Sequence, residues 1–164
     1  MDSFHENMME YKKQLDKGII IEAYRGLMEY LRTLRTYFMN TYREYTISGN
    51  LYQGYMDMSY FAIFTPTLKS RKLKIAIVFL YEAFRFDVWL VGVNKTVQEE
   101  YWNLFKESNL NKYTIPSNIK GIDSIVEYIL VKNPNFRDLD NLTKEIEQGT
   151  LKFIKDIEDF LSKL

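Results

Sequence analysis

The stretch KIAIVFLYEAFRFDVWLVGV, residues 74–93, decides the fold. It divides into two runs, 74–81 and 86–93, which are rich in β-branched and aromatic residues, as strands are. If Glu82 pairs with Arg85 across a two-residue turn, the runs form a hairpin. In that register one face gathers large apolar residues from both runs: Ile75, Ile77, Phe79, Tyr81, Phe86, Val88 and Leu90.

The other face of the predicted hairpin is largely apolar as well. It carries Val78, Leu80, Trp89 and Val91 together with one acid, Asp87. A pair of strands that is apolar on both sides lies centrally in its sheet or is covered on both faces. The sequence therefore predicts either a central place in the sheet for this hairpin or other elements that cover both of its faces.

A third strand is predicted before the hairpin, after the turn-forming residues 48–50. The even positions from Met56 to Phe64 are all apolar, while Asp57 and Ser59 interrupt the odd positions. A period of two is that of a strand, so we expect the even positions to form its buried face.

Helical periodicity surrounds these strands. Apolar residues recur every three or four positions in 3–17, from about 19 to 45, in 96–108 and in 138–164. Residues 122–131 are apolar and short, so they fit a helix or a strand, and we favour the helix.

These patterns predict an α+β fold, in which a three-stranded, mainly antiparallel sheet is covered by about five helices in the order α-α-β-β-β-α-α-α. The hydrophobic fraction of 46% is enough for a core. Because no repeat, low-complexity stretch or linker interrupts the chain, we expect residues 1–164 to form a single domain.

Composition argues against several classes of function. The 22 basic residues balance the 22 acidic ones, which argues against nucleic-acid and membrane partners. The absence of cysteine suits a reducing compartment, and the single histidine, His5, argues against histidine-based catalysis and metal sites. No cofactor motif is found. The start of the chain does not resemble a signal peptide, and charges interrupt 74–93, so we expect a cytoplasmic protein.

Four segments together resemble a family of small bacterial proteins defined as a conserved domain of unknown function. They are GLMEYL at 26–31, YQGYMDM at 52–58, KLKIAIVF at 72–79 and GTLKFIK at 149–155. The resemblance covers nearly the whole chain. It implies a bacterial, intracellular protein, and it brings no activity or binding residue with it.

The order of elements is also similar to the αβββαβ core of the PD-(D/E)xK nucleases. In that core acids hold Mg²⁺ and a lysine helps to position the attacking water, so the similarity implies a metal site of Asp57 with Glu82 or Asp87. The sequence departs from the pattern, because neither Glu82 nor Asp87 begins a Glu-x-Lys or Asp-x-Lys motif. This divergent phosphodiesterase or nuclease is therefore the alternative hypothesis.

Our first hypothesis is a non-catalytic, intracellular module that binds a ligand or a protein. Asp57 within a predicted strand, and Asp87 between apolar neighbours, must each be solvated, paired or functional. With the aromatic residues near them they define a candidate binding surface: Tyr55, Asp57, Asp87 and Trp89. The competing interpretations are that Asp57 lies on a solvated strand face and that Asp87 pairs with Arg85 or Lys74.

The second and last predicted helices have near-heptad apolar spacing. Such spacing fits packing on the sheet and also fits packing against a second copy of the chain. A homodimer therefore stays open at this point, and the remaining partners are unknown.

Overall fold

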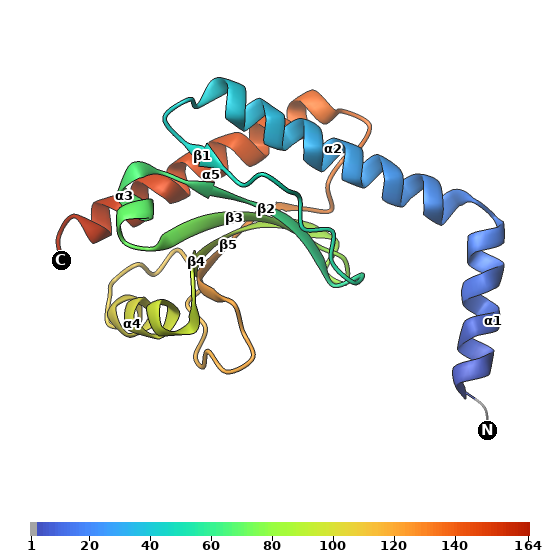
Figure 1. Cartoon of the computed structure of the whole chain (residues 1–164), viewed down its shortest axis with the longest axis horizontal. Coiled ribbons are helices and arrows are strands. Elements are labelled where there is room, and N and C mark those ends of the chain that lie inside the picture. Colours follow the sequence, from blue (N-terminus) through green and yellow to red (C-terminus); the bar gives the residue numbers. More distant parts are fainter. Residues whose placement is uncertain (1–2) are drawn as a thin grey trace.

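The computed structural model describes residues 3–164, and its centre is one antiparallel sheet (Figure 1). The five strands follow one another in the order β1-β2-β3-β4-β5, so each pairs with its neighbour along the chain. The strands are β1 (Thr46–Ile47), β2 (Met58–Phe64), β3 (Leu73–Leu80), β4 (Arg85–Gly92) and β5 (Ser124–Lys132). The predicted α+β class and the antiparallel pairing are confirmed, but the sheet has five strands and not three.

The helices are α1 (Ser3–Asp16), α2 (Ile19–Thr41), α3 (Pro66–Ser70), α4 (Lys95–Lys106) and α5 (Leu139–Leu161). Figure 1 shows α2 and α5 over one face of the sheet, α4 on the other side near one end, and α1 standing away from the sheet. Within the described residues, no helix has the length and apolar character needed to cross a bilayer.

The main core lies between the sheet and the two long helices. The predicted hairpin face from Ile75 to Leu90 is fully buried there, apart from Tyr81 at its end, which is half-buried. Ring contacts join this side of the sheet to α2. The ring centroid of Phe38 lies 6.2 Å from that of Phe61 on β2, and the ring centroid of Tyr30 lies 6.2 Å from that of Phe86 on β4. The apolar stripe of α2 therefore covers β2 and β4 directly.

The hairpin register differs from the predicted one by two residues. Leu80, and not Glu82, lies opposite Arg85, so the turn has four residues. The N–H of Tyr81 donates to the carbonyl of Asp57 at 3.1 Å, and Phe84 takes a left-handed conformation with φ of 53° and packs on Phe79. A shift of two residues returns every side chain to its original face, which is why the predicted face holds.

For β2, both the predicted buried face and the predicted first residue are wrong. The strand begins at Met58, so Asp57 precedes it, and the fully buried residues are the odd ones, Ser59, Phe61 and Ile63. Ser59 tolerates this burial because its hydroxyl is hydrogen-bonded to the carbonyl of Gln53 and to the hydroxyl of Tyr81.

Residues 122–131 were predicted to be helical, and most of them form the edge strand β5. Two irregularities in the pairing with β4, at Phe86/Asp87 and at Leu90/Val91, break the alternation that marks a strand in a sequence. The short elements β1 and α3 were not predicted, and α2 ends at Thr41 and not near Tyr45.

Asp156 of α5 fixes the long segment that connects α4 with β5. Its carboxylate accepts hydrogen bonds from Lys112 at 2.6 Å and from the Tyr113 hydroxyl. Partial burial alone would raise the pKa of Asp156, but these two donors outweigh burial and hold the pKa below its ordinary value of 3.8.

Asp156→Asn is expected to lower the free energy of unfolding at neutral pH by about 1.5–3 kcal/mol, the usual contribution of a hydrogen bond to a charged group. Because the folded pKa is depressed, this contribution is complete above 3.8 and is lost as the pH falls through the folded value. Urea denaturation across that range should show the wild type and the variant converging at acid pH.

Asp159→Asn is the matched control, since Asp159 lies on the same helix in an exposed pair with Lys155. Its effect should stay within about 0.5 kcal/mol. Equal losses in the two variants would show that Asp156 does not anchor the segment.

Candidate functional site

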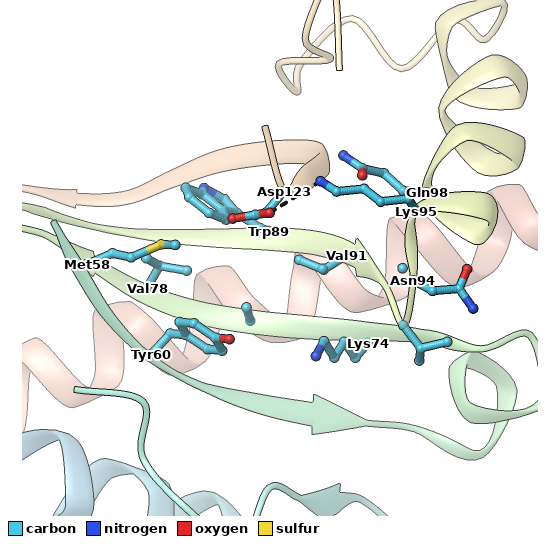
Figure 2. A pocket seen from close by; sticks show the side chains of 13 residues that line it. Met58, Tyr60, Lys74, Val78, Trp89, Val91, Asn94, Lys95, Gln98 and Asp123 are labelled. Atoms are coloured by element: carbon cyan, nitrogen blue, oxygen red, sulfur yellow. Dashed lines mark ion pairs between the residues drawn. The ribbon is translucent and has the colours of Figure 1, made fainter. Parts of the chain in front are cut away.

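A pocket of about 270 Å³ opens on the sheet face opposite α2 and α5, beside the start of α4 (Figure 2). We call it the sheet pocket. Strands β2, β3 and β4 supply most of its wall, and residues 92–98 and Asp123 close one end. Its lining includes Met58, Tyr60, Lys74, Ala76, Val78, Trp89, Val91, Asn94, Lys95, Gln98 and Asp123.

Small side chains on the sheet create the hollow. Ala62, Ala76 and Trp89 lie in one row across β2, β3 and β4, and the next row holds Tyr60 and Val78. The methyl group of Ala76 leaves space that a longer side chain would fill, while Trp89 and Tyr60 on the flanking strands form walls. The pocket is therefore built into the register of the sheet.

The two ends of the sheet pocket differ in polarity. Figure 2 shows Met58, Val78 and Trp89 towards one end, and Lys74 and Lys95 towards the other. Apolar walls with a few convergent polar groups are typical of small-molecule sites. The arrangement suits a ligand with an apolar body and a charged or polar end.

Asp87 orients the indole of Trp89. The carboxylate is completely buried; Oδ1 accepts from Arg85 Nε at 2.8 Å and Oδ2 accepts from Trp89 Nε1 at 3.2 Å. The indole N–H is thus occupied, and the ring forms a fixed wall of the pocket. The interpretation of Asp87 as a paired acid is confirmed for Arg85, and Lys74 is not its partner.

Lys74 brings an uncompensated positive charge into the pocket. Its side chain is half-buried, and its ammonium group has no hydrogen bond or ion pair with any other residue in 3–164. In Figure 2 the hydroxyl of Tyr60 points towards it. Partial burial, with Tyr52 and Asp123 nearby, raises the pKa of Tyr60, so at neutral pH this hydroxyl is protonated and can donate.

The rim beside α4 adds a second cation. Lys95 lies 3.5 Å from Asp123 in an exposed ion pair, and it also donates to the carbonyl of Ile122 at 3.2 Å. The side chain of Asn94 caps α4 by accepting from the N–H of Val97 at 2.9 Å. The positive end of the helix dipole therefore lies at the same rim.

Gly92 allows α4 to lie this close to the pocket. A Cβ atom at Gly92 would come within 2.7 Å of the backbone nitrogen of Gln98. Gln98 is buried and donates to the carbonyl of Ile122 at 2.7 Å, which ties the first turn of α4 to the segment before β5. These contacts fix the polar end of the pocket.

The structure does not gather the four predicted binding residues into one site. Trp89 lines the sheet pocket and Asp87 lies behind it, but Tyr55 is 88% exposed in the loop before β2. Asp57 shapes that loop by accepting from the N–H of Tyr55 at 2.8 Å. The backbone N–H groups of Tyr55 and Met58 lower the pKa of Asp57, as they would in a purely local turn.

The metal site of the alternative hypothesis is not assembled. Asp57 and Glu82 are exposed on separate loops, whereas the buried Asp87 carboxylate is already paired with Arg85. Across residues 3–164, no group of three or more acidic or histidine side chains lies close enough to hold a metal ion. The residues named for that site therefore do not fit Mg²⁺.

Sequence reasoning named Lys74 as a possible partner of Asp87, but it did not include Lys74, Tyr60 or Ala76 among the binding residues. Lys74 begins the predicted run 74–81 of a hairpin that is apolar on both faces, and a lysine there must reach water, a partner or a ligand. The position of Lys74 in this run was therefore the sequence feature that could have identified it as a candidate binding residue. The role of Ala76 depends on its row partners in the sheet, which follow only from the register.

Comparison with known families matches residues 4–161 to a domain of unknown function, DUF7000. The chain belongs to the DUF7000 family. This match confirms the resemblance to a family defined only as a conserved domain, and it names no activity. Comparisons with curated proteins and with solved structures find no match.

Arg85→Met tests the anchor behind Trp89. The change leaves the Asp87 carboxylate buried without its cation, which is expected to cost roughly 3–5 kcal/mol of unfolding free energy. Chemical denaturation followed by circular dichroism measures the loss.

Arg32→Met, on the exposed side of α2, removes the same charge and should change stability by no more than about 0.5 kcal/mol. If Arg85→Met lowered the unfolding free energy as little as Arg32→Met, the burial of the Asp87 carboxylate would not depend on its pairing with Arg85.

Proposed function

We propose that the sheet pocket binds a small amphipathic anion and that this protein is an intracellular, non-catalytic ligand-binding module. The observation that carries the proposal is the ammonium of Lys74, which lines the sheet pocket and has no partner among residues 3–164. A partly desolvated cation without a counterion is unfavourable. A ligand with an anionic group would supply the missing partner.

The surroundings of Lys74 support an anion over a cation or a neutral molecule. Lys95 and the positive end of α4 lie at the same end of the pocket, and Asp123, the acid that lines it, is paired with Lys95. Tyr60 adds a neutral donor. These groups suit a carboxylate or a phosphate, both of which accept charge-assisted hydrogen bonds.

The apolar end limits the body of the ligand. Met58, Val78 and the fixed indole of Trp89 offer a flat, apolar surface. The volume of about 270 Å³ lies just below the range of roughly 300–1,000 Å³ that is usual for ligand pockets. One aromatic ring or a short alkyl chain beside the anionic group fits this space.

Phenylacetate, phenyl phosphate and the uncharged 2-phenylethanol are suitable probes. In a Trp102→Phe background Trp89 is the remaining tryptophan, so its fluorescence reports on the pocket wall. The two anions should bind and change this fluorescence, and 2-phenylethanol should bind at least about tenfold more weakly because it cannot pair with Lys74.

Lys74→Met is expected to weaken binding of the anions by about tenfold to a hundredfold, the equivalent of one charged hydrogen bond of roughly 1.5–3 kcal/mol. Ala76→Leu should abolish binding by filling the hollow. Lys69→Met is the matched control, because Lys69 is exposed on α3 and does not line the pocket.

Thermal unfolding shows whether each variant still folds. The proposal fails if both anions leave the fluorescence of Trp89 unchanged up to millimolar concentration. It also fails if Lys69→Met weakens binding as much as Lys74→Met does.

A further inference from the structure

Helix α1 and the start of α2 form a helical arm that projects from the sheet (Figure 1). None of the residues Ser3–Asp16 is buried, and residues 19–26 of α2 are exposed as well. Gly18 turns the chain between the two helices with φ of 77°. We call residues 3–26 the arm.

An exposed helix of this length is marginal by itself. The 14 residues of α1 lie close to the limit of about 12–15 below which isolated helices are unstable in water. Helices in proteins gain most of their stability by packing an apolar face. Helix α1 has such a stripe, Phe4, Met8, Tyr11 and Leu15, but Phe4 is 74% exposed and Met8 43% exposed.

The arm also continues the stripe with which α2 covers the sheet. Leu31, Leu34 and Phe38 of that stripe are fully buried. Ile20 and Tyr24 extend the same rhythm towards α1, where they are 43% and 36% exposed. An apolar surface that runs beyond the sheet over both helices is typical of an interaction site.

The spacing of the α1 stripe points to a second copy of the same chain. The intervals from Phe4 to Leu15 are four, three and four, and they read the same in both directions. An antiparallel copy therefore places Phe4 against Leu15 and Met8 against Tyr11 about a twofold axis, which is the symmetry of most homodimers.

Charges on α1 complement the same arrangement. Glu6 and Glu10 lie in its first part, and Lys12 and Lys13 follow, with Lys17 just beyond its end. Asp16 is the acid in the second part, and Lys12 already pairs with it at 2.8 Å. In an antiparallel pair the acidic part of each helix lies beside the basic part of the other, and the helix dipoles are also opposed.

We propose that two copies of this protein associate through their arms, with the α1 helices antiparallel. Two helices of 14 residues bury too little surface alone, since stable interfaces bury about 1,200–2,000 Å². The interface therefore extends past the bend at Gly18 onto the exposed start of α2, where Ile20 is 43% exposed, whereas Tyr24 also stacks on Tyr81 of the sheet. This inference is independent of the sheet pocket.

The mass in solution tests the association. Light scattering on the full chain in the micromolar range should return close to twice the chain mass of 19.7 kDa. Met8→Glu puts a charge into the stripe and should yield a monomer. Met9→Glu is the matched control, because Met9 is the next residue on α1, is similarly exposed and lies outside the stripe, so it should remain dimeric.

Cysteine cross-linking tests the antiparallel order, and the chain has no cysteine of its own to interfere. A mixture of Phe4→Cys and Leu15→Cys chains should form a disulfide-linked dimer on mild oxidation, whereas Phe4→Cys alone should not. Cross-linking of Phe4→Cys with itself would indicate parallel arms and would overturn the proposal. A monomeric wild type, or equal dissociation by Met8→Glu and Met9→Glu, would also overturn it.

Discussion

Strands β3 and β4 are apolar on both faces, and the rest of the structure depends on how each face is kept from water. The face with Ile77 and Val88 is completely buried beneath α2 and α5. The face with Val78 and Trp89 has only the shorter helix α4 near one end, so part of it stays open. The sheet pocket lies on this second face, and the start of α4 borders one end of it.

Polar residues on this second face are arranged around the open portion. Asp87 is buried, and its contacts with Arg85 and Trp89 turn a costly charge into a support for the pocket wall. Lys74 lies on the same face without a partner in 3–164, and a ligand can supply one. The two charges thus have different roles, since the first is satisfied within the fold and the second requires something from outside it.

The sequence predicts features that depend on parity and period, and it misses those that depend on register or on partners distant in the chain. The buried hairpin face was predictable because a two-residue shift preserves it. The burial of β2 was not, since Ser59 is satisfied by Gln53 and by the distant Tyr81. Strand β5 was missed because irregular pairing hides its alternation. Trp89 was found as an aromatic residue beside an acid, whereas Ala76 matters only through its row in the sheet.

The most direct test of the central claim is methyl NMR of the full chain during titration with phenylacetate. Val78, Val91, Met58 and Ala76 line the sheet pocket, so their methyl groups report on it. We expect their signals to shift together and to saturate, while those of Ile77 and Val88 on the covered face stay in place. Saturable shifts confined to the arm or to the covered face, or no saturable shift at all, would contradict the account.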